Sequence, residues 1–537
     1  MSSRSRHRAA LAAGILLLVC GLISFGQSSP SSGPPLELIS ALQSTLANHP
    51  ALHIGEQQVV SSRGARRQAS GAFDTVIASQ LSQNRLNNPL TIFNQEQAAL
   101  LGIITKNQIS SITAFDIGAS KQYRNGVRIS PSFINTRTTD NIYDIGGVNL
   151  TTVAFEVNVP LLRGRGRSVV AASETAAGME VDASLLDLNQ TISGLLSNTA
   201  SSYWAAVGAA RNLSVAQNSE KRGEIYVEHV RTLIDAGRVP KSEIHQVEAN
   251  LATRATERIA AEQSLIAARQ QLALAMGLPP DQMADVGTPK GDFPSDNSQV
   301  LATINAYSAQ QFFGFALAHR ADYLAAQRRE TEAKTLLAPA RNGLQPEVDI
   351  NLTTGYSSLE EGTGIGNFFG APGRAPRGPD LGIGVTYQFP PRNDAALGTL
   401  MRAQSDVRQA ELRTLQTGQS IMASVVTAIA GVRNAALQLQ RARAAVEESQ
   451  AALEGEREKY RLGVGQIVDV LTVEDRLTAA EQTQVSAQVG YALALTQLRY
   501  ATGSIVEPDR AVQAVDRLVF FTAPVPVATK PPGAAAP

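Results

Sequence analysis

The 537-residue sequence contains a single cysteine, Cys20, close to its amino terminus. Beyond Cys20, the sequence therefore excludes both a disulfide framework and a thiolate metal site. Aromatic residues make up only 5% of the composition, and the formal net charge is zero. A neutral chain gives no electrostatic reason to expect nucleic acid as a partner, and we predict none.

Long apolar runs and catalytic motifs are also lacking. Because no segment after the first 26 residues offers 18 uninterrupted apolar residues, the sequence predicts no transmembrane helix. The histidines show no metal-ligand spacing, since His49 and His53 are separated by the helix-breaking Pro50. Motifs of hydrolases, phosphate-binding loops and zinc proteases are absent. We therefore expect no catalytic residue, no cofactor and no metal, and we predict that the chain is not an enzyme.

Two long stretches of the chain repeat one another. The second stretch begins at Gly463 and ends at Gly503. The first begins at Gly237 and ends at Gly277, so the two stretches have the same length. After each opening glycine, apolar residues recur at alternating spacings of four and three, which is typical of a helix packed lengthwise on a partner. In the first stretch, two of these seam positions hold charged residues instead, Arg254 and Arg258. The chain is therefore predicted to be an internal duplication.

Each repeat is preceded by a segment that predicts one very long helix. Residues 168–236 and 395–462 contain no proline, and their glycines are isolated. A continuous helix of that length would measure roughly 100 Å, which is too long for a globular domain. Trp204, on the first of these helices, is expected to pack against other side chains. Helices of this length suit a tube that crosses a periplasm.

The amino terminus resembles a secretory signal. Residues 1–26 combine a basic start, an apolar stretch and small residues at the cleavage-determining positions. A membrane anchor is a second interpretation, although the apolar stretch is short for a span. A third interpretation is a lipoprotein acylated at Cys20, although Val19 is bulky for that motif. Each interpretation takes the chain out of the cytoplasm.

Alternating apolar and polar residues predict strands ahead of each helical half. Residues 153–159, 348–352 and 381–389 alternate cleanly, and a weaker fourth segment lies around residues 73–81. A small soluble sheet would fit each segment alone. However, one strand pair precedes each half, and the pairs end alike at Pro160 and Pro390, which favours a membrane barrel. Four strands cannot close a barrel, so we expect three copies to supply twelve.

Residues 84–147 leave two interpretations open. Asn125-Gly126 is a strong hairpin-turn signal between two plausible strands, which would form either an extracellular extension or additional barrel strands.

After the strand that ends at Pro160, Arg163, Arg165 and Arg167 alternate with glycines. A phosphate site is one interpretation of that segment, but a solvated basic collar at the membrane boundary is favoured.

The order of these segments resembles the TolC-like outer-membrane efflux protein family over roughly residues 36–510. Particular matches are residues 159–164, VPLLRG, after a strand, and Gly463 followed by residues 467–471, IVDVL. The resemblance implies a mostly α fold with a β-barrel. Internally duplicated long-helix hairpins would form a trimeric α-barrel, and four strands per chain would contribute to a 12-stranded transmembrane β-barrel. The corresponding segments are 1–26 signal peptide, 27–72 leader and helix, 73–166 first strand pair with an inserted hairpin region, 167–277 first helical hairpin, 278–338 equatorial linker, 339–394 second strand pair, 395–503 second helical hairpin, and 504–537 equatorial segment and disordered tail.

The resemblance also implies a function and its partners. A homotrimer in outer-membrane lipid would be the exit duct of an efflux pump or type I secretion system, working with a periplasmic adaptor and an inner-membrane transporter. The glycine turns would dock the adaptor at the tip of the helical tunnel. These docking residues are Gly237, Arg238, Val239, Gly463, Val464 and Gly465.

Two further residues match the family's gate. Asp469 matches an aspartate that forms a ring at the closed tip, and Tyr460 matches a tyrosine whose hydrogen bonds help to close it. Asp469 also suits a helix amino terminus, where its charge favours the helix dipole. Gly465 and Thr472 depart from the pattern, since the family has a gating arginine and a second aspartate there.

Two other classes of protein remain as alternatives. A passive porin would lack long helical hairpins, and a soluble extracellular coiled-coil scaffold would not need alternating strands that end in a matched proline. Both features of this sequence therefore favour the duct.

Overall fold

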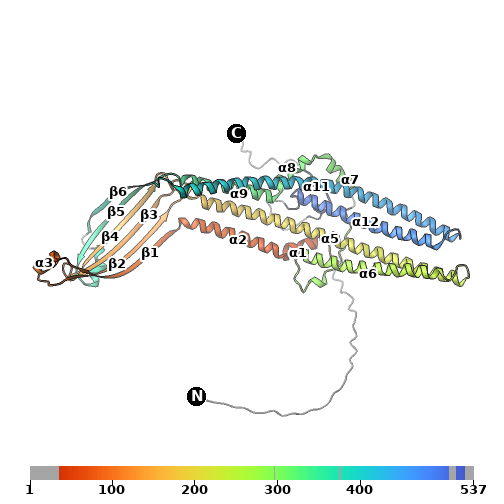
Figure 1. The fold of residues 1–537 in the computed structure, drawn as a ribbon, viewed down its shortest axis with the longest axis horizontal. Coiled ribbons are helices and arrows are strands. Elements are labelled where there is room, and N and C mark those ends of the chain that lie inside the picture. Colours follow the sequence, from red (N-terminus) through yellow and green to blue (C-terminus); the bar gives the residue numbers. More distant parts are fainter. Residues whose placement is uncertain (1–34, 295–296, 374–375, 507–515, 527–537) are drawn as a thin grey trace, which may run out of the picture.

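The computed structural model describes residues 35–294, 297–373, 376–506 and 516–526. The predicted secretory signal (1–26) and residues 527–537 of the predicted tail lie outside this part of the chain. The described part is long and narrow. A β-sheet occupies one end, and long helices run from the sheet to the opposite end (Figure 1).

Four helices pack side by side next to the sheet, in the order α2, α5, α9 and α11. Each leads into or out of a strand within a few residues, so the helical layer and the sheet are continuous. These helices are α2 (Pro50–Ser70), α5 (Ala172–Asp235), which follows the short α4 (Arg167–Val170), α9 (Ala321–Asn342) and α11 (Asp394–Arg461).

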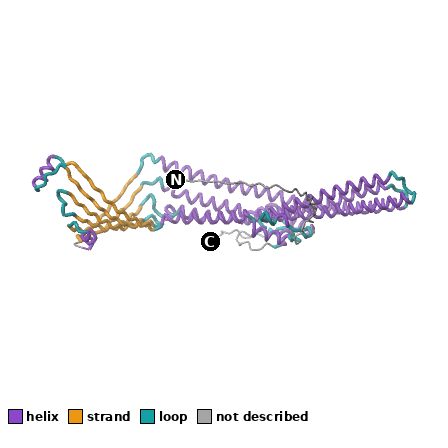
Figure 2. The backbone as a smooth tube through the Cα atoms, turned by 90° about the horizontal axis from the view of Figure 1, so that it is seen from below, coloured by secondary structure: helices purple, strands orange, loops and turns teal. Residues whose placement is uncertain are grey.

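Two helical hairpins form the end farthest from the sheet (Figure 2). Helix α5 turns back as α6 (Glu243–Met276), and α11 turns back as α12 (Ile467–Ala501). Helix α12 also packs on α5, which joins the two hairpins. These are the long hairpins that the repeated sequence predicts.

The duplication extends to the way in which each hairpin ends. Gly277 follows α6 with φ 70°, and a Cβ atom there would lie 2.5 Å from the Cα of His49, between α1 (Leu38–Asn48) and α2. Gly503 follows α12 with φ 69°, and a Cβ atom there would lie 2.8 Å from the carbonyl carbon of His319. His319 is the last residue of α8 (Ala309–His319), which precedes α9. Each glycine thus allows a hairpin end to approach the break between two helices.

A core midway along the molecule packs around the break between α1 and α2 (Figure 1). Trp204 on α5 is only 1% exposed, and its ring lies 5.3 to 5.8 Å from those of Tyr203, Phe293 and Phe521. The predicted packing role of Trp204 is therefore confirmed. Helix α7 (Asn297–Ala306) and the short η4 (Arg517–Phe520) flank this region, which we call the equator.

The sheet contains six strands in the order β1-β2-β3-β4-β5-β6, and all neighbours are antiparallel. The prediction of four strands per chain was therefore wrong, and the twelve-strand count derived from it loses its basis. The additional strands, β2 and β3, come from the region that the sequence left open. The six strands are β1 (Thr75–Pro89), β2 (Asn107–Gln122), β3 (Arg128–Asp140), β4 (Val148–Pro160), β5 (Glu347–Glu361) and β6 (Pro376–Gln388).

One face of the sheet carries most of its large apolar side chains. Directly paired residues lie on the same face of a sheet. Phe133 is paired with Val153, and Leu352 is paired with Ile383. Following the pairs across all six strands defines an apolar face in the half of the sheet next to the helices. Its residues are Ile77, Leu81, Phe115, Ile117, Ile129, Phe133, Val153, Phe155, Val157, Val159, Val348, Ile350, Leu352, Tyr356, Leu381, Ile383, Val385 and Tyr387.

The opposite face carries mainly small and polar residues. Gly118, Ala154 and Gly384 are typical of it, and the acids Asp116 and Glu156 lie there too. A sheet with one lipid-facing and one lumen-facing side alternates in this way.

One helix of the described residues, α11, is apolar and long enough to cross a membrane by length and composition alone. Its best 18-residue window has a mean hydropathy of 1.4 and is 39% buried. No uninterrupted run of 18 apolar residues lies within α11, as the sequence analysis states. Along its length α11 packs against α8, α9 and α12, so it belongs to the helical layer.

Candidate functional site

The two glycine turns lie at the tip of the molecule, at the end farthest from the sheet (Figures 1 and 2). Gly237 and Gly463 have φ of 69° and 78°, in the left-handed region that favours glycine. In both turns the next residue donates its backbone N–H to the helix it has just left, Arg238 to Leu233 and Val464 to Lys459. The two turns therefore share one helix-ending motif.

The exposed parts of the turns differ in chemistry. Arg238 is exposed beside the half-buried Val239, whereas Val464 is 77% exposed beside the half-buried Gly465. A Cβ atom at Gly465 would lie 3.2 Å from the Cβ of Lys459, so this glycine permits close approach of the chain to the end of α11. One turn thus presents a cation and the other presents an apolar side chain.

The two predicted gate residues occupy different environments. Asp469 is exposed on the first turn of α12, near the Lys459 side chain. Tyr460 lies in the last turn of α11, with its ring 6.1 Å from that of His229 on α5. Burial, and to a lesser extent Glu243, raises the pKa of the Tyr460 phenol. Its hydroxyl is buried, and it has no hydrogen-bond partner among the described residues.

A buried charge cluster lies behind the gate residues, and the sequence analysis missed it. The Glu474 side chain on α12 is completely buried, and it forms ion pairs with Arg222 on α5 and Arg457 on α11. The Tyr226 hydroxyl on α5 also donates a hydrogen bond to Glu474, at 3.3 Å. Burial raises the pKa of Tyr226, and the Glu474 charge adds to that shift. A single carboxylate thus connects three helices.

The two arginines that interrupt the apolar seam also form ion pairs. Arg254 on α6 is 2% exposed and donates to Asp475 on α12 at 2.9 Å and to the Ser219 carbonyl on α5 at 3.0 Å. Arg258 pairs with Glu220 at 2.7 Å. Arg254 therefore links the two hairpins directly, which explains why a seam position holds a charged residue.

A groove opens beside this cluster, between α5, α11 and α12. Its volume is about 420 Å³, and apolar, aromatic and cationic side chains share its walls. The lining residues are Arg222, Ile225, Tyr226, His229, Arg457, Tyr460, Arg461 and Val470. The groove borders both Tyr460 and the cluster that holds α12 in place.

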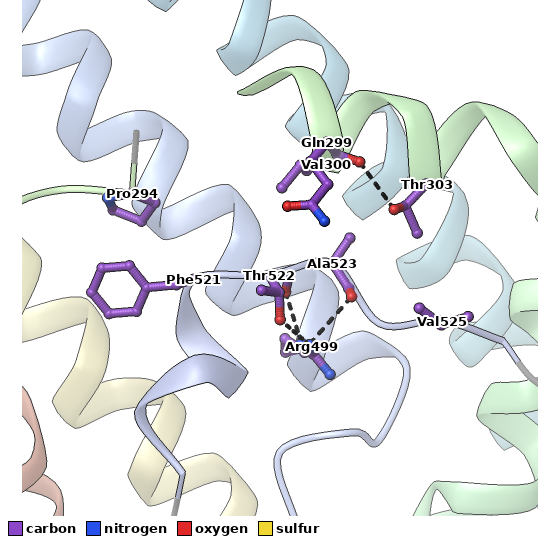
Figure 3. Close-up of a pocket in the computed structure, with 9 residues that line it drawn as sticks. All are labelled: Pro294, Gln299, Val300, Thr303, Arg499, Phe521, Thr522, Ala523 and Val525. Carbon is purple, nitrogen blue, oxygen red and sulfur yellow. Dashed lines mark hydrogen bonds between the residues drawn. The ribbon is translucent and has the colours of Figure 1, made fainter. Parts of the chain in front are cut away.

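A second cavity, of about 610 Å³, lies at the equator (Figure 3). Arg499, at the end of α12, donates there to the Thr522 hydroxyl at 2.7 Å and to the Thr522 and Ala523 carbonyls at 3.0 and 3.3 Å. Burial lowers the pKa of Arg499 to about 10. Since these donors already have acceptors, we interpret Arg499 as a clasp that holds the C-terminal segment against α12.

The arginines that follow β4 form contacts within the chain. Arg163 pairs with Glu347 at the start of β5, and Arg165 donates to the Leu161 carbonyl at 3.4 Å. These contacts are consistent with a collar at the junction of sheet and helices.

Comparisons with known proteins agree on one family. Residues 134–278 and 314–504 match the family described as outer membrane efflux protein. The outer membrane protein TolC of Vibrio cholerae serotype O1 is 24% identical over 329 residues, which cover 59% of this chain and 70% of TolC.

Solved structures share the fold. The outer membrane protein VceC of Vibrio cholerae has a TM-score of 0.61 at 17% identity, with 87% of this chain and 96% of VceC covered. The outer membrane channel CmeC of Campylobacter jejuni has a TM-score of 0.60 at 14% identity, with 94% of this chain and 96% of CmeC covered.

Proposed function

The chain belongs to the outer membrane efflux protein family, and we propose that three copies of it assemble into one continuous duct. As a member of this family it is an outer-membrane exit duct of a tripartite efflux system, with its helices in the periplasm. Channels of this kind are trimers that work with adaptor proteins and inner-membrane transporters. The family is one of channels rather than of enzymes.

The open edges of the sheet are the observation that supports a trimer. Strands β1 and β6 each have a neighbour on one side only, which leaves two rows of unpaired backbone groups. Unpaired backbone groups cost several kcal/mol each in lipid, so a membrane sheet has to close. Neighbouring copies supply the missing strands, because β1 and β6 run in opposite directions and would pair antiparallel.

The helical layer has matching open sides. Helices α2 and α11 are the first and last of its four helices, and both expose large apolar side chains. We infer that α11 of one copy packs on α2 of the next, which would remove these side chains from water. The exposed apolar residues are Ile54 and Val60 on α2, and Leu397, Met401, Leu412, Leu415, Val426 and Leu437 on α11.

We further propose that the tip is both the gate and the docking surface. The turns at Gly237–Val239 and Gly463–Gly465 meet the helical hairpins of the periplasmic adaptor. Asp469, exposed at the tip, contributes to a ring of three carboxylates, while Tyr460 and the Glu474 cluster hold α12 against its neighbours. Because Gly465 and Thr472 carry no charge, they add neither a cation nor a second acid to this gate, and the ion pairs that help to close it are those of Glu474.

The mass of the detergent-solubilised protein tests the assembly. Native mass spectrometry should give a complex of three 56.9 kDa chains, less any cleaved signal. A stable monomer or dimer in detergent, or a protein that stays soluble without detergent, would contradict the trimeric duct.

A further inference from the structure

The hairpin β2–β3 adds two strands to the sheet of each chain. We propose that this hairpin forms part of the barrel wall, so that three copies close an eighteen-stranded barrel as wide as the helical tunnel below it. The inference rests on the trimer proposed above.

The apolar face shows that the hairpin is built for the membrane wall. Phe115 and Ile117 on β2, and Ile129 and Phe133 on β3, lie on the same face as Val153 and Phe155 of β4. The apolar band therefore crosses the inserted strands without interruption. An extracellular flap would have no reason to carry a lipid-facing side in register with the strands around it.

The turn of the hairpin is fixed to the helical body at the periplasmic side. Arg124 donates two hydrogen bonds of 2.7 Å to Glu174 on α5, and its guanidinium lies over the Phe73 ring. The Gly166 N–H donates to the Asn125 carbonyl at 3.0 Å. Gly126 has φ 101° and lies so close to Gly164 that a Cβ atom would be 2.3 Å from its carbonyl oxygen. These contacts hold the turn level with the ends of the neighbouring strands.

Six strands also match the width of the helical layer. Strands about 4.8 Å apart and tilted by about 40° occupy roughly 38 Å of circumference when there are six, and roughly 25 Å when there are four. Four helices packed about 9 to 10 Å apart occupy roughly 36 to 40 Å. Six strands therefore occupy about the same width as the four helices to which they connect.

Three such sheets define the channel. Eighteen strands with this spacing and tilt give a backbone diameter of about 36 Å, compared with about 24 Å for twelve. Barrels of 16–18 strands hold an open aqueous channel. The lumen-facing side adds little obstruction, because Gly118, Gly355, Gly382 and Gly384 all lie on it.

The exposure of the edge strands indicates where the copies join. On the apolar face, Ile77 of β1 is 72% exposed and Ile383 of β6 is 76% exposed, compared with 41% for Phe155 in the middle of the sheet. A missing neighbouring strand accounts for this difference. The partner that fits is a second copy of this chain, with its β6 against β1.

Disulfide mapping on the full-length protein tests the order of the strands. We expect the pairs Ser82→Cys with Ala114→Cys, and Ser132→Cys with Ala154→Cys, to form disulfides, because each pair is directly opposed in the sheet. Ser82→Cys should not bridge to cysteines at Leu150, Thr152 or Ala154, since β1 and β4 lie about 14 Å apart. A bridge between β1 and β4 would place the hairpin outside the wall and overturn the inference.

Electron cryo-microscopy of the trimer separates this inference from the proposed function. Eighteen strands, with β1 of each copy paired with β6 of the next, would support it. A trimer with twelve strands in the wall would overturn the inference and leave the duct intact. A monomer would contradict the proposed function itself. Polymer exclusion measures the width of the barrel. The largest polymer that enters from the extracellular side should have about 1.5 times the diameter of the largest one that a twelve-stranded barrel admits.

Discussion

Arg222 on α5 and Glu474 on α12 form an ion pair in which the carboxylate is completely buried. Arg457 on α11 shares the same carboxylate at 3.2 Å, so three helices of the tip depend on one negative charge. Breaking a fully buried ion pair typically costs about 3–5 kcal/mol, and here the cost is lower because the two arginines are 23% and 44% exposed to water.

We therefore expect Glu474→Gln to loosen the tip without disturbing the sheet. Hydrogen exchange should accelerate in residues 467–480 and around Arg222, because Arg457 loses its carboxylate partner and Arg222 keeps only the more distant Glu481. Glu481→Gln is the matched control. It removes the weaker ion pair of Arg222, which is 3.5 Å long, and keeps Glu474. Equal exchange in the wild type and Glu474→Gln would rule out this role.

The docking turns give a second prediction. Replacing Gly463 with valine forces a side chain into the left-handed region, at a cost of about 1–2 kcal/mol, although a Cβ atom there meets open space. The trimer should remain in the membrane while export fails, as judged by the growth of complemented deletion cells in the presence of toxic compounds that the wild type expels. Gly455→Leu, in the exposed interior of α11, is the control. Full growth of the Gly463→Val strain would show that this turn is not part of the docking surface.

Asp469 gives a third prediction. In a ring of three carboxylates, mutual repulsion and counter-ion attraction would make the closed tip cation-selective and sensitive to polyvalent cations. Asp469→Ala should reduce both properties in single-channel recordings, and Thr472→Ala should not. If neither property changes, Asp469 is a helix-terminal acid that lies away from the axis.

The glycines at the equator give a fourth prediction. A Cβ atom at Gly277 would overlap the backbone of His49, and the positive φ adds strain. Gly277→Ala should therefore lower the melting temperature of the trimer, and Gly503→Ala should do the same at His319. Gly314→Ala is the control, because a Cβ atom at Gly314 meets open space inside α8, where alanine favours the helix by up to about 1 kcal/mol. Unchanged melting of both variants would contradict the close packing.

The parts of the fold with a local signature could be predicted from the sequence. The helical hairpins follow from their heptad spacing and terminal glycines, and β4, β5 and β6 follow from clean alternation. The hairpin β2–β3 has no such signature, since serines and threonines interrupt the alternation. Pro131 in the middle of β3 also argues against a central strand, yet it pairs with Phe155 there.

The Glu474 cluster was beyond prediction for a different reason. Arg222 lies 252 residues before Glu474 in the sequence, and Arg222, Arg457 and Glu474 each resemble an ordinary exposed charge in their own segment. Arg254 and Arg258 did leave a signal, because charged residues at seam positions indicate that partners lie across the interface.

The unequal turns have a consequence for stoichiometry. In the proposed trimer, three copies would present six hairpin tips around one axis, and the tips would alternate between a cationic turn at Arg238 and an apolar turn at Val464. A partner bound six times around the duct therefore occupies two chemically different kinds of position, and its six copies have unequal affinities. A partner bound three times can select one kind of tip and leave the other free.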